Sequence, residues 1–247
     1  MSHAKTIPWI DSFDFKPGRV IAGKYMIEQK LGGGWEGEVY RVVERRTGIR
    51  RAAKLFFPQR NIKDRALEFY AKKLERLHDC PIVIQYHHSE TIQHRGMKIT
   101  CLISEFVNGE LLSRFIARQP GRRLHHFEAL HLIYTLARGL EEIHDLTDYH
   151  GDLHDGNVLV RRQGILFDAK LVDFYHWGRP TKAHLRDDVA DLVRILYDTV
   201  GGRARYQTQP PEIKMICRGL RRDLIGKQFP TARHLREHLE TFEWTSG

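Results

Sequence analysis

A glycine-rich run near the N-terminus constrains this chain more than any other feature. Residues 31–40 read LGGGWEGEVY, and residues 52–54 follow as AAK, where the chain is expected to re-enter a sheet. Far downstream lie HGDLHDGN at residues 150–157 and LVDF at residues 171–174. A lone glycine triad would be weak evidence, but four such pieces in one order are hard to obtain by chance.

These motifs resemble those of the protein-kinase superfamily, and the resemblance runs from about Tyr25 to the C-terminus. It implies an α+β fold with two lobes, a sheet-rich N-lobe and a helical C-lobe. We expect an irregular lead-in at residues 1–20, the N-lobe at residues 21–107 and the C-lobe at residues 108–247.

Composition excludes several classes of protein. Hydrophobic residues make up 41% and charged residues 29% of the 247 positions, which favours a core-forming globular protein over a disordered one. No apolar run reaches the ~18 residues of a membrane-spanning helix, and the first residues lack the apolar segment of a secretory signal. The three cysteines are too few and too scattered for a disulfide framework. We therefore expect a cytoplasmic protein with no membrane partner.

The formal net charge is +9, and the surplus clusters in four arginine-rich stretches. One interpretation is attraction to an anionic partner. The favoured interpretation is solvated strand edges and helix faces, because no stretch is interleaved with the aromatic residues of a stacking platform. The four stretches are Arg41–Arg51, Arg118–Arg123, Arg161–Arg162 and Arg218–Arg222.

Hydrophobic periodicity predicts a change from strands to helices near residue 108. The strands expected before it are residues 25–32, 38–43, 49–56, 82–86 and 99–106, and a helix is expected at residues 61–77. The helices expected after it are residues 111–117, 127–144, 185–200 and 233–239, with short strands at 158–160 and 166–172. One face of the helix at 127–144 should carry Ile133, Leu136, Leu140 and Ile143.

The resemblance implies that ATP is bound largely by the N-lobe. Gly32, Gly34 and Gly37 would let the backbone approach the phosphates, and Lys54 would contact the α- and β-phosphates. A glutamate of the following helix is expected to pair with Lys54; Glu68 is preferred for its distance from the next segment, and Glu75 is the alternative. The adenine-contacting residues implied by position are Leu31, Val39, Ala52, Glu105, Val107 and Leu159, with Ser104 as a small gatekeeper.

Asp152 is the strongest single candidate for catalysis. In the resemblance its carboxylate accepts or orients the proton of the attacking hydroxyl. Asn157 and Asp173 would hold Mg²⁺, a hard cation that prefers oxygen ligands. Asp168 is a rival metal ligand, but it is expected to lie in a turn. His150 is expected to be a structural residue beneath the catalytic loop.

The chain departs from the family pattern in two places. Gly151 stands where the family usually has an arginine that pairs with a phosphorylated activation loop, which argues against switching by phosphorylation of that loop. Asp188 resembles the aspartate that starts the long C-lobe helix, yet it follows Asp173 by only about fifteen positions, with no APE motif between them. We therefore expect a minimal activation segment and a shortened C-lobe that lacks a helix.

The sequence thus predicts an ATP- and Mg²⁺-dependent phosphotransferase. The preferred hypothesis is a serine/threonine protein kinase with a protein substrate. The alternative acceptor is a small molecule or sugar, because residues 150–157 are close to the HGDLHPGN of aminoglycoside phosphotransferases. A non-catalytic nucleotide-binding scaffold is a further alternative. The presence of Lys54, Asp152, Asn157 and Asp173 speaks against it.

Overall fold

The computed structural model describes residues 9–164, 166–176 and 178–243. The chain divides into two compact units. Unit 1 comprises Met1–His78 and Ile84–Val107, and unit 2 comprises Asp79–Val83 and Asn108–Gly247. Residues 1–8 of the expected lead-in lie outside the described residues.

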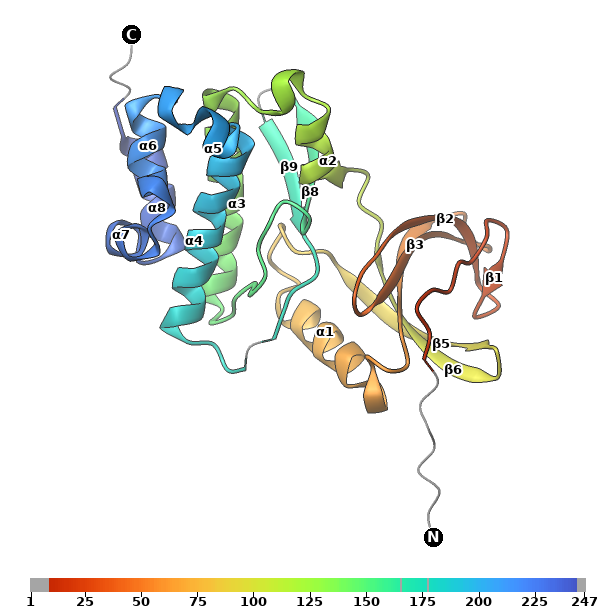
Figure 1. Cartoon of the computed structure of the whole chain (residues 1–247). Coiled ribbons are helices and arrows are strands. Elements are labelled where there is room, and N and C mark those ends of the chain that lie inside the picture. Colours follow the sequence, from red (N-terminus) through yellow and green to blue (C-terminus); the bar gives the residue numbers. More distant parts are fainter. Residues whose placement is uncertain (1–8, 165, 177, 244–247) are drawn as a thin grey trace. The chain divides into compact units, whose positions relative to one another are not determined.

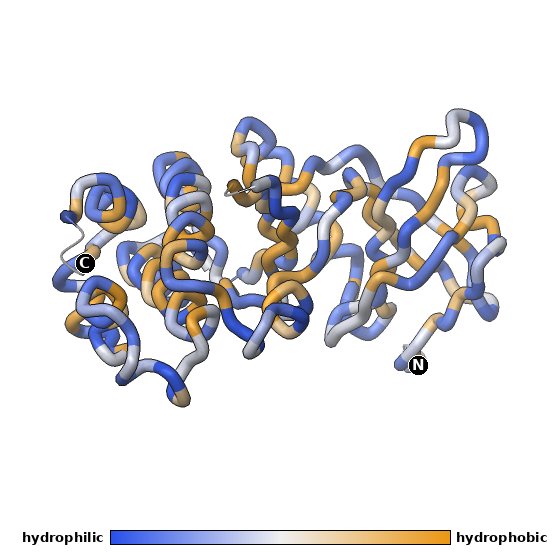
Figure 2. The backbone as a smooth tube through the Cα atoms, turned by 90° about the horizontal axis from the view of Figure 1, so that it is seen from above, coloured by the Kyte–Doolittle hydropathy of each residue, from blue (hydrophilic) through white to orange (hydrophobic). Residues whose placement is uncertain are grey.

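Unit 1 is built on a six-stranded antiparallel sheet with the order β1-β2-β3-β4-β6-β5 (Figure 1). The strands are β1 (Val20–Ile21), β2 (Tyr25–Gly33), β3 (Gly37–Glu44), β4 (Arg50–Phe56), β5 (Tyr86–His94) and β6 (Met97–Glu105). Burial alternates along β5 and along parts of β2 and β3, and Figure 2 shows the hydropathy of the residues along the backbone. This alternation with a period of two residues buries one side of a strand and solvates the other.

The described part of the lead-in belongs to the core of unit 1. Phe13 and Phe15 are buried, and their rings lie 5.2 Å from Phe57 and 5.8 Å from Tyr40, respectively. The backbone N–H of Phe13 donates to Glu38, the residue directly after the last glycine of the loop, at 3.2 Å. These contacts tie the segment before β1 to the hairpin that carries the glycine-rich run.

Helix α1 (Arg65–Arg76) belongs to unit 1 and contacts β5 and β6. Its buried face includes Leu67, Tyr70 and Leu74, which are three and four residues apart and therefore lie on one side of the helix. Glu68 and Glu75 lie on exposed sides of α1. The inward face of the helix therefore carries Tyr70, and neither of the candidate glutamates lies on that face.

The strand expected at residues 82–86 is wrong. Residues 79–83 belong to unit 2, where Val83 forms a parallel bridge to Leu171 and the carbonyl of Ile82 accepts a hydrogen bond from the Leu171 N–H at 2.7 Å. The strand proper, β5, begins at Tyr86 and consists mostly of polar residues. It lies at the edge of the sheet, so it needs only one apolar side and gives a weak hydrophobic signal.

Unit 2 is mainly helical (Figure 1). Helix α3 (His126–Asp145) packs against α4 (Lys182–Thr199) and α8 (Ala232–Thr241). Ile133, Leu136, Leu140 and Ile143 are all buried, which confirms the predicted inward face of α3. Unit 2 also contains α2 (Leu112–Ala117), α5 (Gly202–Arg205), α6 (Pro211–Cys217), α7 (Arg222–Gln228) and a small sheet of β7 (Glu110–Leu111), β8 (Val158–Gln163) and β9 (Leu166–Leu171).

The segment between the last strand of unit 2 and α4 is short. Tyr149 anchors it by donating a hydrogen bond from its hydroxyl to the carbonyl of Gly178 at 2.9 Å. Thr181 caps α4, because its hydroxyl oxygen accepts from the N–H of His184 at 3.3 Å. Within the described ranges, no helix is both long enough and apolar enough to cross a bilayer. Cys80, Cys101 and Cys217 are buried free thiols.

Candidate functional site

The glycine-rich loop connects β2 to β3 in unit 1. The N–H of Gly34 donates to the carbonyl of Gly37 at 2.9 Å and closes the turn. A Cβ atom at Gly37 would lie 1.9 Å from the carbonyl oxygen of Leu55, so only glycine fits there. At Gly32 and Gly34 a Cβ would meet nothing within 4 Å. Packing in this structure therefore does not require glycine at those two positions, whereas close approach of a ligand such as a phosphate would.

Lys54 lies on β4, opposite Val39 of β3 in the sheet register. Its ammonium Nζ is 2.8 Å from Glu36 Oε2 and 3.9 Å from the centroid of the Tyr70 ring. Glu36 comes from the glycine-rich loop itself, and the hydroxyl of Tyr70 donates to the same Oε2 atom at 2.8 Å. The lysine is thus held by the loop and by the inward face of α1.

The expected Lys54–Glu68 pair is not the arrangement seen. Glu68 forms an ion pair with Lys72 one turn along α1, at 3.3 Å, and its side chain is 60% exposed. The physical reason is helix periodicity, because Leu67 and Tyr70 occupy the buried face and leave Glu68 on the solvent side. Sequence reasoning missed Glu36, since no local pattern indicates where a loop side chain will fold back.

The residues expected around adenine lie as follows. Ala52 of β4 is opposite Ser104 of β6 in the register, and Ser104 is buried. Glu105 donates its N–H to the carbonyl of Gln85 at 2.9 Å, and its own carbonyl accepts from the hydroxyl of Ser104 at 3.4 Å. Leu31 lies on β2 and Val107 is the last residue of this part of unit 1. Leu159 lies on β8 of unit 2.

Asp152 and Asn157 lie next to each other in the loop between α3 and β8. The side-chain amide of Asn157 donates to the backbone carbonyl of Asp152 at 2.8 Å and to its carboxylate Oδ2 at 3.3 Å. Asn157 is buried, whereas the Asp152 side chain is 56% exposed. The arrangement fixes an accessible carboxylate in one orientation, and it directs the amide oxygen of Asn157 away from Asp152.

His150 supports this loop from beneath, as the sequence predicted. It is fully buried, its Nε2 lies 3.0 Å from the carbonyl of Val172, and its Nδ1 accepts from the N–H of Asp152 at 3.3 Å. These two contacts place the proton of a neutral imidazole on Nε2. The carbonyl of His150 also accepts from the N–H of Tyr175 at 2.9 Å. One residue therefore joins the loop of Asp152 to the segment after Asp173.

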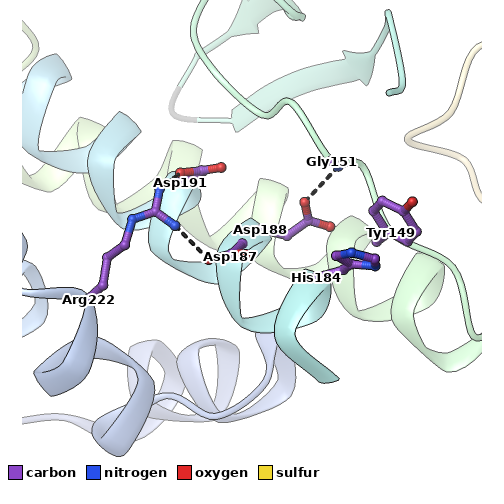
Figure 3. Close-up of a pocket in the computed structure, with 7 residues that line it drawn as sticks. All are labelled: Tyr149, Gly151, His184, Asp187, Asp188, Asp191 and Arg222. Atoms are coloured by element: carbon purple, nitrogen blue, oxygen red, sulfur yellow. Dashed lines mark hydrogen bonds and ion pairs between the residues drawn. The ribbon is translucent and has the colours of Figure 1, made fainter. Parts of the chain in front are cut away.

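Asp188 anchors the start of the same loop from α4 (Figure 3). Its two carboxylate oxygens accept from the N–H of His150 at 2.7 Å and of Gly151 at 2.8 Å, and His144 Nε2 lies 3.2 Å away. Burial alone would raise the pKa of Asp188, but the hydrogen bond from His144 and the neighbouring imidazoles hold that pKa below its usual value. Asp188 is therefore a buried, ionised anchor.

A cavity of about 420 Å³ lies behind this loop, on the α4 side (Figure 3). On its wall Arg222 of α7 bridges Asp187 and Asp191, with 2.7 Å to each carboxylate. Burial raises the pKa of Asp191 to about 6, although Arg222 opposes the shift. The described residues that line the cavity are Tyr149, Gly151, His184, Asp187, Asp188, Asp191 and Arg222. Asp152 is not among them.

Gly151 has no room for the arginine that the family usually places there. Its φ is +83°, in the left-handed region that glycine tolerates and L side chains rarely adopt. A Cβ would lie 2.9 Å from the Tyr149 ring and 3.0 Å from the carbonyl oxygen of Tyr175. The loop backbone itself thus excludes a side chain at this position.

Asp173 is the second residue after the end of β9, and its backbone φ is +56°. A positive φ is uncommon for a residue other than glycine and is found at functional sites. The next-door residue Val172 donates its N–H to the carbonyl of Asn157 at 3.0 Å, which ties the start of this segment to the loop of Asp152. Asp168 lies on β9, opposite Arg161 of β8 and 3.0 Å from it, and not in the turn that was expected.

The donor set fits a magnesium ion. Asn157 has its amide nitrogen engaged with Asp152, so the amide oxygen is the atom left to act as a ligand, and Asp173 adds a carboxylate. Amide and carboxylate oxygens are the ligands that Mg²⁺ takes beside phosphate and water.

Many of the arginines in the four basic stretches have carboxylate partners. Arg50 pairs with Glu28, Arg118 with Glu110, and Arg162 with Glu128. Arg161 and Arg222 are paired as described above. Such ion-paired positions favour the interpretation of solvated faces over a dedicated anion-binding surface.

Comparison with known proteins extends this picture. The sequence model of the family described as the protein kinase domain matches residues 25–190. Over 160 residues the chain is 26% identical to the serine/threonine-protein kinase PknA of Mycobacterium tuberculosis, which covers 64% of this chain and 36% of that protein. Over 161 residues it is 30% identical to the serine/threonine-protein kinase pkn2 of Myxococcus xanthus, covering 63% of this chain and 18% of that protein. The chain thus matches about a third or less of the length of these relatives.

A solved structure of similar fold is the kinase domain of Mycobacterium tuberculosis PknI. The TM-score is 0.65 at 20% sequence identity, and the match covers 92% of this chain and 98% of that chain. A kinase domain described as PF14_0431 gives a TM-score of 0.59 at 18% identity and covers 76% of this chain. At these identities the likeness shows the α+β fold.

Proposed function

Because this chain belongs to the protein kinase family, we propose that it transfers the γ-phosphate of ATP to a serine or threonine hydroxyl of a protein. The observation that carries the proposal is the exposed carboxylate of Asp152, which Asn157 holds in one orientation. A general base must be accessible to the group whose proton it takes and must be fixed in place. Asp152 meets both requirements.

The reaction assigns distinct tasks to the residues. The hydroxyl oxygen of the acceptor attacks the γ-phosphorus, the bond to the bridging oxygen breaks, ADP leaves, and Asp152 takes the hydroxyl proton. Lys54 neutralises charge on the α- and β-phosphates, and Gly32 and Gly34 leave room for them. Val39, Ala52 and Leu159 supply apolar contacts to the adenine ring.

Asn157 and Asp173 would hold magnesium through their oxygens. When bound there, the ion would neutralise charge on the phosphates of the nucleotide. The remaining work falls to the chain itself, because Asp188 and His150 keep the loop of Asp152 in place.

Two observations bear on the acceptor. The relatives named above are serine/threonine-protein kinases, which supports a protein hydroxyl over a small molecule. A scaffold without activity is disfavoured, since the chain keeps Lys54, Asp152, Asn157 and Asp173. The buried free thiols Cys80, Cys101 and Cys217 agree with the proposed cytoplasmic, reducing location.

The decisive experiment compares the wild type with Asp152→Asn, using ATP labelled on the γ-phosphate. Transfer should fall by a factor on the order of 10²–10⁴, the range for loss of a positioned base. Binding of ATP should change little, because Asp152 acts on the acceptor. Label should enter protein and not a filterable small product. Near wild-type transfer by Asp152→Asn, or label only in small molecules, would contradict the proposal.

A further inference from the structure

We infer that Glu36 of the glycine-rich loop is a carboxylate that positions Lys54 for the phosphates of ATP, and that Tyr70 of α1 holds Glu36 in place. The inference deepens the proposed function and rests on it only in that the ligand is ATP. The family pattern predicts a glutamate of the helix as the partner of Lys54, and it assigns no such role to Glu36 or Tyr70.

The geometry converges on one atom. Oε2 of Glu36 accepts two hydrogen bonds of 2.8 Å, from Lys54 Nζ and from the Tyr70 hydroxyl. The face of the Tyr70 ring lies 3.9 Å from the same ammonium group. The side chains of Lys54 and Glu36 are only 14% and 24% exposed, and Tyr70 is buried. A shielded, charge-assisted hydrogen bond is stronger and better oriented than a surface ion pair.

The backbone of Glu36 is fixed on the strand that carries Lys54. The carbonyl of Glu36 accepts from the N–H of Phe57, just past the end of β4, at 2.9 Å. The following residue, Gly37, lies so close to the carbonyl of Leu55 that a Cβ would clash. Residues 36 and 37 are therefore attached to the stretch of chain directly after Lys54, at Leu55–Phe57. This attachment directs the Glu36 side chain to the lysine.

The helix cannot supply the carboxylate in this structure. The side chain of α1 that contacts Lys54 is Tyr70. Its ring attracts a cation but carries no charge. Glu68 is engaged with Lys72 on the exposed side. The Tyr70 hydroxyl instead donates to Glu36, so the helix contributes by orienting the loop carboxylate. An ammonium has three N–H donors, so a hydrogen bond to Glu36 is compatible with donation to phosphate oxygens.

The test measures binding of ATP and of adenosine by the full chain in the wild type and in four variants. Glu36→Gln keeps the size of the side chain and removes its charge. Tyr70→Phe keeps the ring and removes only the hydroxyl. Glu68→Gln makes the same chemical change as Glu36→Gln on the helix. Glu90→Gln on β5 breaks the ion pair of Glu90 with Lys24 and is the control for loss of a lysine–glutamate pair elsewhere in unit 1.

Glu36→Gln should weaken ATP binding and raise the KM for ATP about 10-fold, as expected for losing a hydrogen bond to a charged group. Tyr70→Phe should show a smaller loss of the same kind, about 3-fold. Adenosine has no phosphates, so its affinity should stay within about twofold of wild type in both variants. Glu68→Gln should have less effect on ATP than Glu36→Gln, and Glu90→Gln should have none.

Three outcomes would overturn the inference. Tighter ATP binding by Glu36→Gln would mean that the carboxylate competes with the phosphates. A larger loss from Glu68→Gln would return the role to the helix. Equal loss of ATP and adenosine in both Glu36→Gln and Tyr70→Phe would make the contact merely structural. If ATP binding depends on Glu36 as described but no hydroxyl is phosphorylated, the proposed function fails while this inference stands.

Discussion

Asp188, on the first turns of α4, accepts a hydrogen bond of 2.8 Å from the backbone N–H of Gly151, the residue that precedes Asp152. A buried carboxylate on a helix thus fixes the backbone on which the proposed catalytic base is mounted. The N–H of His150 donates to the other oxygen, so Asp188 binds two successive peptide units. Removing its charge should therefore affect the loop as well as the fold.

Asp188→Asn is expected to lower both stability and phosphoryl transfer. The amide would turn an N–H₂ group toward at least one backbone N–H, and it would lose the charge that His144 complements. The free energy of unfolding should fall by roughly 2–4 kcal/mol, as for breaking a buried charged network. Urea unfolding at pH 7 gives the stability, and the rate of phosphoryl transfer is followed in the same preparation.

The pH dependence supplies a second measure. Because the folded-state pKa of Asp188 is lowered, its stabilising contribution is present above the ordinary aspartate pKa and disappears as the pH falls through the folded-state value. The stability difference between wild type and Asp188→Asn should therefore shrink in acid. Asp187→Asn, next to it on the exposed side of α4, is the control. An equal loss in both variants would contradict the anchoring role.

The residues proposed to carry the chemistry could be picked out from the sequence because their motifs are local. Lys54, Asp152 and Asn157 each occur in a short run with fixed spacing, and the apolar period of α3 gave its buried face. The prediction of a strand at residues 82–86 was wrong because the apolar residues Ile82 and Val83 make their contacts in unit 2. Periodicity alone does not distinguish these uses of a short apolar run.

The partner of Lys54 could not be predicted for a different reason. Residues 36 and 54 are distant in sequence, and their contact depends on how the loop lies along β4, fixed by the close approach of Gly37 to Leu55. Tyr70 carried a usable signal, since it lies on the apolar face of α1 between Leu67 and Leu74. That face identifies the side chain directed inward, and Glu68 is not on it.

Asp191 should make the stability of the protein depend on pH in mildly acidic solution. Burial raises its folded-state pKa to about 6, against an ordinary value of 3.8. The folded state therefore binds this proton more tightly than the unfolded chain, so the free energy of unfolding falls as the pH rises from about 4 to about 6 and then levels off. Asp191→Asn should remove this fall, which is at most about 3 kcal/mol.

The measurement is urea unfolding of wild type and Asp191→Asn at several pH values between 4 and 7, read as the difference between the two proteins. Asp187→Asn is the matched control, because Asp187 is the other carboxylate bound by Arg222 and is more exposed. A constant difference between wild type and Asp191→Asn across this range would show that Asp191 does not titrate there.

Asp173→Ala should weaken Mg²⁺-dependent ATP binding far more than Asp168→Ala. Asp173 is proposed as a metal ligand, whereas Asp168 is an exposed strand residue paired with Arg161. We expect at least about a 10-fold loss for Asp173→Ala and less than a twofold loss for Asp168→Ala. Titrations with ATP in magnesium and in EDTA separate the two, because the loss should vanish without the metal. The reverse ranking would move the metal ligand to Asp168.

The protein should be active without prior phosphorylation. Gly151 has a φ of +83° and no space for a Cβ, so no side chain at this position can bind a phosphate. The segment from Asp173 to Asp188 spans only about fifteen positions. Thr181 in this segment already caps α4, because its hydroxyl oxygen accepts from the N–H of His184. Phosphatase-treated protein should therefore retain its rate of transfer.

Thr181→Ala should cost about 1 kcal/mol of stability through the lost cap and leave the rate of transfer nearly unchanged. A large loss of rate after phosphatase, restored by preincubation with ATP in wild type but not in Thr181→Ala, would show instead that this hydroxyl is a regulatory phosphosite.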